Sequence, residues 1–389
     1  MNNVLTQYMD KLKQKIQGLN VRPMDLARKE LSIEDMAMLN YHEEMGRSGT
    51  SIYAGMIVED HVADIRGKDW AKKVNEIRRS DSNVAMVLKA LKLPIKSANW
   101  YVAIDEDKIK HIDITPEIQS VIDKQKRIME KAFFDDAKTP FTRLLGEILT
   151  FLDHGYSLFE VTHKVVFDDK ELGIYNTIND IACRGQTTIE SWNVDKYGNL
   201  LSVDQWTDGD MSNYAEMEAQ FLLHFAPEQE GDNYEGVSVL RPMWGNWMRK
   251  NAYLKWIASG NEKSAIPTPM IEFLSTPTPQ EMAAAKKVLT NYTSGSKNFL
   301  INSANSKLTT FTVTFDPEKM MKCVTYEDQA MVNCILASFL FLGQNGNGGS
   351  LALGKDLSDF FTQTFNTTTD YICEVLQKRI IAPIIESNM

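Results

Sequence analysis

Apolar side chains in the first part of the chain recur at spacings typical of helices. Apolar residues three or four positions apart predict two helices within residues 69–93, and Pro94 is expected to stop the second. The same spacing predicts a helix over 117–133 and another from Pro140 to Gly155, because proline suits a first helical turn and glycine a helix end. The residues that define the first two helices are Trp70, Val74, Ile77, Val84, Val87, Leu88 and Leu91.

Strands are predicted between and after these helices. Residues 100–104 look like a strand, apolar and polar residues alternate at 156–161, and residues 192–200 have the form of a strand that enters a glycine turn. Helices and strands are thus interspersed, so residues 30–235 are expected to form an α+β region. Residues 1–30 are basic and polar and are interpreted as an arm.

One long helix dominates the next part of the chain. Residues 238–259 carry an apolar stripe, and Gly260 is expected to end the helix. Arg249, Lys250 and Lys255 place positive charge away from the centre of that stripe. The stripe consists of Leu240, Trp244, Trp247, Leu254 and Ile257.

A small α/β unit of about sixty residues follows. We expect strands at 267–273, 299–301 and 309–315 and a short helix at 279–292. A second long helix is expected over 326–342. Two long helices therefore bracket the small unit.

A glycine-rich segment and a last helix complete the pattern. Residues 343–349 hold four glycines in seven positions, which predicts a flexible loop. Asp356 is placed to cap a final helix that Pro383 is expected to end. The apolar face of this helix is Leu357, Phe361, Phe365, Ile372, Val375 and Leu376.

The composition is that of an ordered globular chain. Of 389 residues, 43% are hydrophobic and 24% are charged, so two or more structural regions are expected. The net charge of −10 argues against a protein that grips nucleic acid over its whole surface, although a local patch could still contact DNA. Neither a bilayer-spanning apolar run nor the apolar core of a signal peptide is evident, so no membrane association is expected.

Cysteine and histidine give no sign of a disulfide framework or a metal site. The cysteines are scattered, which indicates reduced thiols in a cytoplasmic setting. The six histidines show neither HExxH nor close Cys/His spacing, so we expect no metal and no cofactor. No local signature of a catalytic triad is evident, and no enzymatic activity is expected. The cysteines are Cys183, Cys323, Cys334 and Cys373.

The segment 349–356 comes close to a phosphate-binding loop. Gly349, Gly354 and Lys355 fit GxxxxGK, but Asp356 stands where a Ser or Thr hydroxyl would ligate Mg²⁺. A loop that leads into a capped helix is the preferred interpretation. A P-loop-type nucleotide-binding or nucleic-acid enzyme is the alternative, and ATP hydrolysis lost on Lys355→Ala would favour it.

Two other groups of residues have a structural interpretation. Carboxylates cluster at 105–107, 135–136 and 168–169, each at a predicted turn, where Asp favours the turn itself. Tryptophans on the helix over 238–259 could stack on bases, but at helical spacing they are better explained by packing.

The order of the elements indicates the subunit of a ring. Helix, small unit, helix, glycine loop and long helix is an unusual order for an enzyme. Two helices side by side can form a wall, and a heterologous contact that closes gives a cyclic ring. The unit between the helices would then project at one end, and the glycine loop would reach the lumen. A different ring-forming capsid protein, such as an adaptor, is a third reading, against which the two-helix bracket speaks.

Ordered segments of this chain resemble phage portal proteins, most nearly the Mu-like branch. Each segment is weak alone, but their order and spacing hold from about residue 50 to 385. The segments are Asp81-x-x-Val84-x-x-x-Leu88 leading to Trp100-Tyr101-Val102; Gly155-Tyr156-Ser157-Leu158-Phe159-Glu160-Val161; Ile189-x-x-Trp192-x-x-Asp195-x-x-Gly198; His224-Phe225 followed by Gly236-Val237-Ser238-Val239-Leu240-Arg241-Pro242; and Gly349-Ser350-Leu351-Ala352-Leu353-Gly354.

The resemblance implies a dodecameric ring at one vertex of a tailed-phage capsid. It implies that the ring passes the genome in during packaging, retains it, releases it at ejection and connects head to tail. The implied partners are further copies of the chain, double-stranded DNA, the large terminase subunit, the major capsid protein and a head–tail adaptor, with no membrane. The implied location is the virion, with the host cytoplasm during assembly.

The resemblance also assigns regions and site residues. The implied fold is α+β and predominantly helical. Its regions are an N-terminal arm and wing (1–237), a first stem helix (238–262), a small α/β clip (263–323), a second stem helix (324–342), a tunnel loop (343–355) and a long wing helix with a short or absent crown (356–389). The tunnel-loop residues are Gly343, Gln344, Asn345, Gly346, Asn347, Gly348, Gly349 and Ser350. The stem residues are Trp244, Trp247, Arg249, Lys250 and Leu254, and the clip residues are Pro277, Pro279, Tyr292 and Lys297.

The charge of such a ring bears on how DNA would move through it. Twelve copies at −10 each give a strongly negative ring, and a negative or neutral lining repels phosphates and avoids sticking. We hypothesise that Gln344, Asn345 and Asn347 present uncharged groups to the DNA, and that lysines there slow its passage. The exposed clip face is expected to bind terminase first and the adaptor afterwards.

Overall fold

The structure combines helices with small antiparallel sheets. The computed structural model divides into two units, Met1–Arg47 and Ser48–Met389, and the elements given below belong to the second. This mixture confirms the expected α+β class, in which helix predominates. The residues described are 46, 48–58, 62–104, 114–207, 213–265, 268–290, 306–311, 315–334 and 351–389, with the backbone alone at 268, 308, 311 and 351–361.

Helices and strands alternate along the chain. The helices and helical turns are η1 (Ala63–Ile65), α3 (Gly67–Ser80), α4 (Ser82–Ser97), α6 (Pro116–Glu130), η2 (Lys131–Asp135), α7 (Phe141–Ile148), α8 (Thr150–His154), η3 (Gln186–Thr188), η4 (Ala219–Phe221), α9 (Trp244–Ala265), α10 (Pro279–Thr290), α11 (Pro317–Asn333), α12 (Leu351–Leu376), η6 (Gln377–Ile381) and α13 (Ala382–Ser387). The strands are β1 (Ile52–Tyr53), β2 (Met56–Ile57), β3 (Ser157–Asp169), β4 (Gly173–Arg184), β5 (Ile189–Val194), β6 (Leu200–Trp206), β7 (Tyr214–Glu218), β8 (Leu222–Phe225), β9 (Thr268–Phe273) and β10 (Ser306–Phe311).

The predicted helix pair near the start is present as α3 and α4, which meet at Asp81. The Asp81 side chain accepts hydrogen bonds from the backbone N–H groups of Asn83 and Val84 and so caps α4. α4 passes through Pro94, so the expectation that this proline stops the helix is wrong. Ile95 is buried in the main core directly after the proline, and this packing stabilises the last turn in helical form.

The segment expected as a strand at 100–104 is not part of any sheet among the described residues. Trp100 and Val102 pack against the core whereas Tyr101 is exposed, so burial alternates as it would in a strand. The indole Nε1 of Trp100 donates a hydrogen bond to the carbonyl of Ile95. The alternation in burial therefore comes from packing on the core and not from strand pairing.

The next two predicted helices are present with different internal boundaries. α6 and the π-helical turn η2 cover the helix expected over 117–133. The helix expected from Pro140 to Gly155 is divided into α7 and α8 at Leu149. Gly155 ends α8 with a φ of 101°, in the left-handed region that glycine adopts without strain, as predicted.

Two antiparallel three-stranded sheets have the orders β4-β3-β8 and β5-β6-β7. The predicted strand at 156–161 is present, but β3 continues to Asp169 and returns as β4. A register shift between Thr162 and His163 interrupts the alternation, so the sequence did not indicate this long hairpin. β5, a turn at Gly198 and β6 confirm the strand and glycine turn expected over 192–200.

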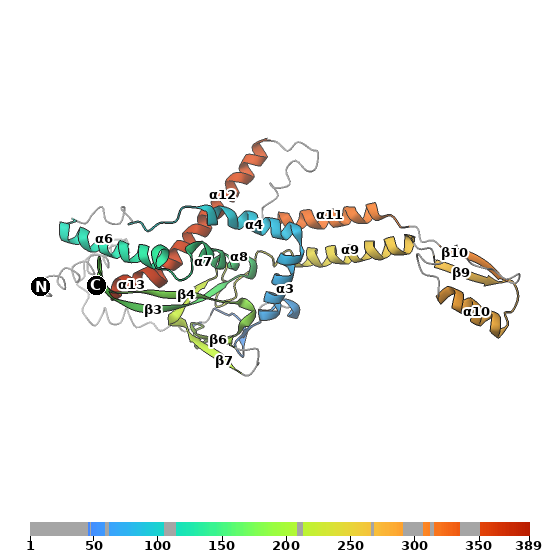
Figure 1. Cartoon of the computed structure of the whole chain (residues 1–389), viewed down its shortest axis with the longest axis horizontal. Coiled ribbons are helices and arrows are strands. Elements are labelled where there is room, and N and C mark those ends of the chain that lie inside the picture. Colours follow the sequence, from blue (N-terminus) through green and yellow to red (C-terminus); the bar gives the residue numbers. More distant parts are fainter. Residues whose placement is uncertain are drawn as a thin grey trace. The chain divides into compact units, whose positions relative to one another are not determined.

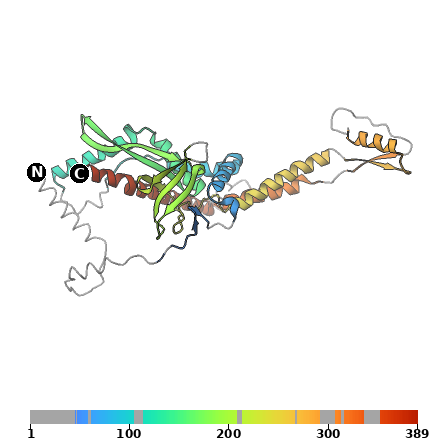
Figure 2. The same cartoon turned by 90° about the horizontal axis from the view of Figure 1, so that it is seen from below.

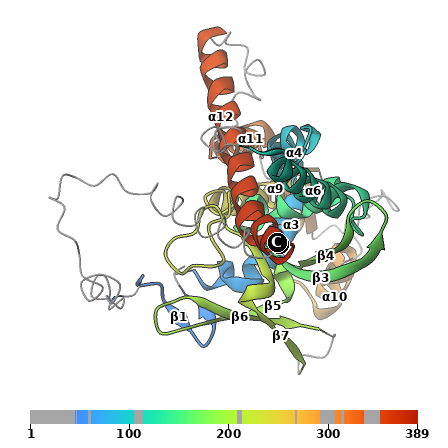
Figure 3. The same cartoon turned by 90° about the vertical axis from the view of Figure 1, so that its left-hand side faces the viewer.

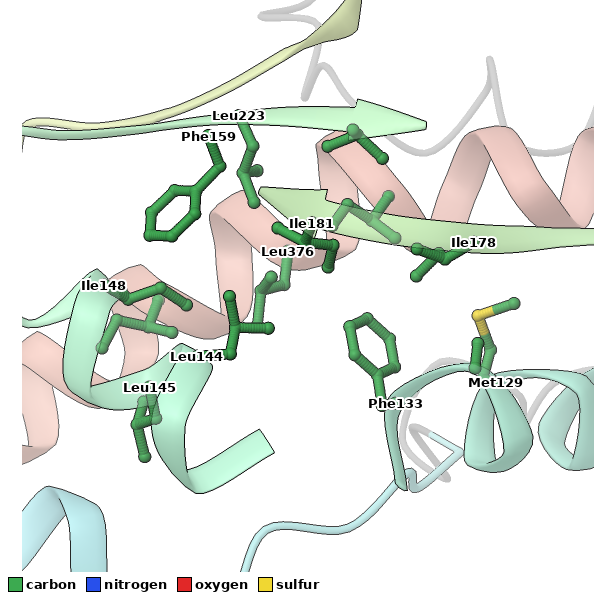
Figure 4. Packing of buried hydrophobic residues seen from close by; sticks show 14 of the residues in the cluster. Met129, Phe133, Leu144, Leu145, Ile148, Phe159, Ile178, Ile181, Leu223 and Leu376 are labelled. Carbon is green, nitrogen blue, oxygen red and sulfur yellow. The ribbon is translucent and has the colours of Figure 1, made fainter. Parts of the chain in front are cut away.

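The first residues of β3 lie between two hydrophobic cores. Phe159 belongs to the main core with the helices, whereas Leu158 belongs to a second cluster with Trp192 and Val203 of β5 and β6. Successive residues of a strand point to opposite faces, so helices cover one face of β3 and the second sheet covers the other (Figure 3). Figure 4 shows the main core, in which side chains from α6, α7, the first sheet and α12 interdigitate.

The C-terminal helical stretch is longer than expected. α12 begins at Leu351, so Asp356 lies inside the helix and does not cap it. Pro383 lies in the first turn of α13, so the expectation that it ends the helix is also wrong. Ile380 and Ile384 are fully buried on either side of the proline, and the π-helical turn η6 accommodates the missing N–H.

α9 and α11 lie side by side as a pair that we call the α9–α11 hairpin (Figures 1 and 2). α9 begins at Trp244, later than the expected 238, because residues 238–243 form turns at its base. α9 also passes through Gly260, so this glycine does not end the helix. A Cβ at Gly260 would lie 2.7 Å from ring atoms of Phe315, so glycine here permits a close approach.

α11 begins at Pro317 and not at the expected 326. The Asp316 side chain caps it by accepting hydrogen bonds from the backbone N–H groups of Glu318 and Lys319, and Pro317 occupies the first turn. These cap signals lie in the sequence but are less conspicuous than the apolar stretch that follows. The end predicted for this helix, at 342, lies outside the described residues.

The small α/β unit between these helices is present. β9 and β10 pair in antiparallel fashion, with Phe273 opposite Ser306, and α10 lies between them in the chain. They confirm the strand predicted at 267–273 and the helix predicted at 279–292, while β10 begins before the predicted strand at 309–315. The strand expected at 299–301 falls outside the described residues. Among the described helices, none has the length and apolar character needed to cross a bilayer.

Candidate functional site

Buried and half-buried positions along the α9–α11 hairpin recur at a spacing close to the 3.5 residues of paired helices. This seam contains apolar, aromatic and charged residues. It differs from the predicted stripe at Leu254, which is 40% exposed, whereas the neighbouring Tyr253 faces the seam. The seam positions are Trp247, Lys250, Tyr253, Ile257, Gly260 and Ser264 on α9 and Met320, Val324, Glu327 and Met331 on α11.

The two predicted stem tryptophans lie at the base of the hairpin. Trp247 is buried and stacks on Trp244, and Trp244 meets Trp70 of α3 edge to face with ring centroids 6.1 Å apart. Both belong to a cluster that joins α3 and α4 to Leu240 and Met331. These tryptophans therefore attach the hairpin to α3 and α4, which agrees with the packing interpretation.

Arg249 connects the two helices of the hairpin. Its Nε and Nη2 atoms donate to the two carboxylate oxygens of Glu327 at 2.9 and 3.0 Å. Glu327 is buried, with 3% of its surface exposed, while Arg249 is half exposed. This two-bond geometry fixes the register of α9 against α11 more strictly than a single contact would.

Lys250 is buried, which corrects the expectation that it would supply charge away from the packed face. Its Nζ atom lies 2.7 Å from Asp81 and 2.6 Å from Asp328, so one cation joins α9, α11 and the cap of α4. Burial acts against its charge, but the hydrogen bonds to Asp328 and Asp81 outweigh burial and raise the pKa of this amine. We call Asp81, Lys250 and Asp328 the base triad.

The sequence pattern indicated the cations of the hairpin but not their acidic partners. Arg249 and Lys250 are adjacent on one helix, and Glu327 and Asp328 are adjacent on the other. Two adjacent cations on one helix and two adjacent acids on the other, in helices that bracket one small unit, indicate that the helices pair as a hairpin. The error in the start of α11 obscured this signal, because it placed Glu327 and Asp328 at the end of the helix and not in the middle of the seam.

The outer faces of the hairpin expose large apolar side chains. On α9, Trp256 is 58% exposed, and on α11, Tyr326 is 66% exposed. Most of the charges on the seam are already paired within the chain, as the ion pairs above show. The exposed large apolar residues of the hairpin are Met248, Leu254, Trp256, Met321 and Tyr326. Leu254 and Trp256 are two residues apart and so lie on different sides of α9, which indicates that other protein surfaces cover the hairpin on more than one side.

Two of the segments that resemble portal proteins, those that begin at Gly155 and at Gly236, contact each other through these glycines. A Cβ at Gly155 would lie 2.4 Å from the carbonyl oxygen of Glu235, and one at Gly236 would lie 2.6 Å from the carbonyl oxygen of Gly155. Both have positive φ, so only glycine fits both the space and the backbone. The segment that leads into α9 is thereby held against α8, where the N–H of Val239 donates to the carbonyl of Leu152.

Glu235 is a partly buried acid that no pattern in the sequence indicated. It accepts hydrogen bonds from Nε1 of Trp192, at 3.4 Å, and from the backbone N–H of Gly67 at the start of α3. Burial outweighs these hydrogen bonds and raises its pKa to about 7. A single glutamate in a loop has no periodicity or spacing that would have pointed to it.

A second buried charge cluster lies beside it. Asp153 is 1% exposed and accepts hydrogen bonds from Arg78 of α3 and Lys92 of α4. Burial lowers the pKa of Lys92 in spite of this partner. Burial, together with the positive charges of Arg78 and Lys92, lowers the pKa of His154 to about 3, so its imidazole is neutral at physiological pH.

The predicted clip prolines flank a capped helix. Pro277 precedes α10 and Pro279 occupies its first turn, on either side of Thr278. The Thr278 hydroxyl accepts from the N–H of Glu281, and the Glu281 carboxylate accepts from the N–H of Thr278, which is a capping box. The other two predicted clip residues, Tyr292 and Lys297, lie outside the described residues.

The predicted tunnel loop falls largely outside the described residues. Its site residues, Gly343 to Ser350, all do so. Residues 351–355, which the resemblance placed in the same loop, are helical, because α12 begins at Leu351. A phosphate-binding loop needs irregular backbone at Leu351–Leu353 to turn its N–H groups toward phosphates, so this helix argues against the nucleotide-binding alternative.

The carboxylate clusters have structural partners where they are described. Asp135 accepts a hydrogen bond from Arg127, and Asp169 accepts one from Lys131 while its side chain also closes the turn before Leu172. The cluster at 105–107 lies outside the described residues. Among the residues that are described, no three His, Cys, Asp or Glu side chains are close enough to hold a metal ion.

Comparison with solved structures gives matches at low sequence identity. The neck of an empty GTA particle, computed with C6 symmetry, has a TM-score of 0.50 at 10% identity and covers 81% of this chain and 82% of that chain. The neck of a native GTA particle, computed with C12 symmetry, has a TM-score of 0.46 at 9% identity, with 79% and 81% covered. An HK97-family phage portal protein from Corynebacterium diphtheriae has a TM-score of 0.29 at 9% identity, with 61% and 77% covered.

Sequence comparison identifies the family. No protein with a curated function matches this chain. The family model described as the portal protein of Mu bacteriophage matches residues 72–389, which include every element from within α3 to the C-terminus. The chain therefore belongs to the Mu bacteriophage portal protein family, and its function is that of a phage portal.

Proposed function

We propose that copies of this chain assemble into a closed ring of twelve at one vertex of a phage capsid, and that double-stranded DNA passes through the ring. In this assignment, α9 and α11 are the stem, and β9, α10 and β10 form the clip. The elements before α9, together with α12 and α13, form the wing. The tunnel loop is the segment between α11 and α12.

The observation that carries the ring is the apolar surface on the outer faces of the α9–α11 hairpin. The seam of the hairpin is satisfied within one chain, since Arg249 pairs with Glu327 and Lys250 with two carboxylates. Trp256 and Tyr326 remain exposed on its two helices. If α9 of one copy packs on α11 of the next, the contact is heterologous, and repetition closes a ring. A chain of similar fold in a particle neck computed with C6 symmetry supports this proposal.

The charge of the chain fits a bore through which DNA slides. The net charge is −10, and the two stem cations described above are engaged with carboxylates of the same chain. Of the six cations on α9 and α11, Lys255, Lys263, Lys319 and Lys322 remain exposed, and each of them would give phosphates only a brief, salt-dependent contact. The amides of Gln344, Asn345 and Asn347 would add uncharged groups at the tunnel loop.

We assign to the clip the binding of different protein partners at successive stages of assembly. It exposes apolar side chains at Met270, Leu274, Met282 and Leu289 although it is a small unit. Such a surface fits a protein partner, and we assign it to the large terminase subunit during packaging and to a head–tail adaptor afterwards. The wing would contact the major capsid protein, which places the assembled ring in the virion after assembly in the host cytoplasm.

Ring formation is tested by placing a charge on the apolar surface of the hairpin. Trp256→Asp should shift the purified chain from rings with a central hole to monomers, as seen by negative-stain microscopy and native mass spectrometry, because the contact would have to bury the new carboxylate. Leu201→Asp is the matched control, since Leu201 on β6 is 56% exposed and Trp256 is 58% exposed. Rings formed by Trp256→Asp as readily as by the control, or a wild-type chain that stays monomeric at high concentration, would refute the proposal.

A further inference from the structure

We propose that the outer face of α4, together with the end of α3, binds the phosphate backbone of double-stranded DNA outside the bore of the ring. Arg79, Lys89 and Lys96 define this surface, which we call the α4 basic face. The proposal does not depend on DNA passage through a ring, because a single chain carries the same face.

The helices α3 and α4 have a charge balance opposite to that of the whole chain. Residues 67–97 contain eight Lys and Arg residues but only three Asp and Glu residues, which gives a net charge of +5 within a chain of net charge −10. Salt screens exposed charges beyond about 10 Å, so a polyanion responds to the charges nearest to it and not to the net charge of the protein. These two helices therefore attract nucleic acid in an otherwise acidic chain.

Five of the eight cations form ion pairs within the chain. Two of the five, Arg78 and Lys92, share the single carboxylate of Asp153. The three residues of the α4 basic face form no ion pair or hydrogen bond through their side chains with any part of the chain that the structure describes, so they are available to an external anion. The other ion pairs are Lys68–Glu190, Lys72–Asp69 and Lys73–Glu76.

The two lysines of the face lie on one side of α4. Lys89 and Lys96 are seven residues apart, so they are about 10 Å apart along the helix axis and point in nearly the same direction. Both are exposed, as is Arg79 in the last turn of α3. α4 lies at the surface, on the side of the molecule away from β6 and β7 (Figures 1 and 3). A duplex that lies along α4 can thus contact both lysines at once.

The cations of this region are close enough to repel one another. Burial is the largest cause that lowers the pKa of Lys92, Asp153 acts against it, and the positive charges of Arg78 and Lys96 lower the pKa further. The ammonium of Lys96 lies over the neighbouring helix α7, since a Cβ at Gly146 would be 3.2 Å from its Nζ atom. A phosphate bound beside these cations would offset their repulsion, which favours binding.

A protein is the competing occupant, because the same face exposes two apolar side chains. Met86 is 42% exposed and Leu93 is 57% exposed. Lysine is depleted where proteins bury surface against each other, whereas cations clustered along one face of a helix are typical of nucleic-acid binding. The unpaired cations of the α4 basic face therefore favour DNA over a protein partner.

The test uses relaxed, covalently closed DNA circles, which cannot thread through a closed ring. Binding of the full-length chain to these circles is measured by mobility shift at several salt concentrations. With one phosphate contact for each of the three cations, the affinity should fall about 40-fold between 50 and 200 mM salt. Circles of unrelated sequence should bind equally, because phosphate contacts carry no sequence information.

A variant without the three cations tests the site itself. The triple variant Arg79→Gln, Lys89→Gln and Lys96→Gln should bind at least tenfold more weakly at 50 mM salt and lose most of the salt dependence. It removes no ion pair from the described part of the chain, so its thermal unfolding should match that of the wild type. DNA binding unchanged in this variant would overturn the proposal.

A control variant removes the same charge from exposed sites that are not clustered. Lys124 lies on α6, Lys170 in the turn between β3 and β4, and Lys196 in the turn between β5 and β6. The triple glutamine variant at these positions should bind the circles as the wild type does. Equal weakening in both triple variants would mean that net charge alone governs binding, and the α4 basic face would then not be a site.

The reactivity of lysines toward an amine reagent distinguishes DNA from a protein occupant. In assembled rings without DNA, Lys89 and Lys96 should react as readily as Lys170, and DNA circles should protect them. Mass spectrometry of the labelled peptides measures this protection. Protection in rings without DNA would show that a neighbouring copy covers α4 and would rule out the DNA site. So would a folded wild-type chain that binds no circles at 50 mM salt.

Discussion

The roles of several single residues in this chain become evident only from their surroundings in the structure. Glu235 has no pattern in the sequence, yet its carboxyl lies between the start of α3 and the indole of Trp192. Lys250 was expected away from the packed face, yet its amine joins three helices. The burial of a charged side chain depends on which segments surround it, and residues far apart in the chain supply those segments here.

Glu235→Gln is expected to stabilise the protein above neutral pH. The folded-state pKa is about 7 and the ordinary value is 4.5, so the folded state binds this proton more tightly than the unfolded state does. The stability that the neutral acid contributes is complete below about pH 4.5 and is lost as the pH rises through about 7. Glutamine cannot ionise, so the advantage of the variant over wild type should grow to at most about 3 kcal/mol by about pH 8. Urea unfolding across this range measures it.

The histidines provide an internal check on that experiment. The pKa values of His154 and His224 are lowered to about 3 and about 4, in both cases chiefly by burial. The stability that these neutral imidazoles contribute is present above their ordinary pKa of 6.5 and is lost as the pH falls toward the folded-state values. Both proteins share this slope, so it cancels in the difference. A difference between variant and wild type that stays constant with pH would contradict the assignment of Glu235.

At the scale of elements, the α9–α11 hairpin depends on a few specific contacts. The base triad ties both helices to the cap of α4, and Gly260 lets Phe315 approach the backbone of α9. The sequence predicted both helices, but it misplaced the start of each one and the end of α9. The turns before α9 and the glycine inside it acquire their roles only from the partner segment, whereas the local cap of α11 is less conspicuous in the sequence than the apolar stretch that follows it.

Lys250→Met should destabilise the folded chain by about 3–5 kcal/mol, because it leaves the buried Asp81 and the partly buried Asp328 without their cation. Chemical denaturation measures the loss. Lys255→Met is the control on the same helix, since Lys255 is exposed, and should change stability by less than about 0.5 kcal/mol. Adding Asp328→Asn to Lys250→Met should recover part of the loss. Equal effects of the two lysine variants would show that the base triad contributes nothing to the attachment of the hairpin.

Two glycines of α9 should respond to alanine in opposite directions. A Cβ at Gly245 would meet only Nη1 of Arg249, at 3.5 Å, so Gly245→Ala should stabilise by about 0.5 kcal/mol through helix propensity. A Cβ at Gly260 would lie 2.7 Å from the ring of Phe315, so Gly260→Ala should cost about 1–3 kcal/mol through overpacking. Thermal unfolding of both variants gives the comparison. Stabilisation by both alanines would mean that Gly260 is not needed for a close approach.

At the scale of the whole molecule, the order of elements carried more information than any one motif. Helix, small unit, helix and long helix are all present in that order, and the family model covers residues 72–389. The phosphate-loop pattern rests on three matched residues, and part of it is helical. A short motif is met by chance more easily than an ordered set of weak ones, because each added segment must also fall at the right distance.

The clip should be separable from ring assembly. Deleting residues 275–297, or placing charges at Met282 and Leu289, should leave rings intact by electron microscopy but abolish co-sedimentation with the cognate large terminase subunit. Met282 and Leu289 lie seven residues apart on one face of α10 and are both exposed, so the substitutions alter the surface of the clip and not its core. Met86→Asp on α4 is the control at a similarly exposed position. Normal DNA packaging by the deletion variant would show that the clip does not bind the terminase.

The sequence by itself determined the class of the fold, the long helices of the hairpin, the small unit between them and the family. These follow from periodicity and from the order of segments, which are local or one-dimensional properties of a chain. Tertiary structure alone decided which charges are buried and that α4 and the C-terminal helices continue past their prolines. Each of those outcomes depends on the free energy of packing against residues that are distant in the chain, and no local pattern records that energy.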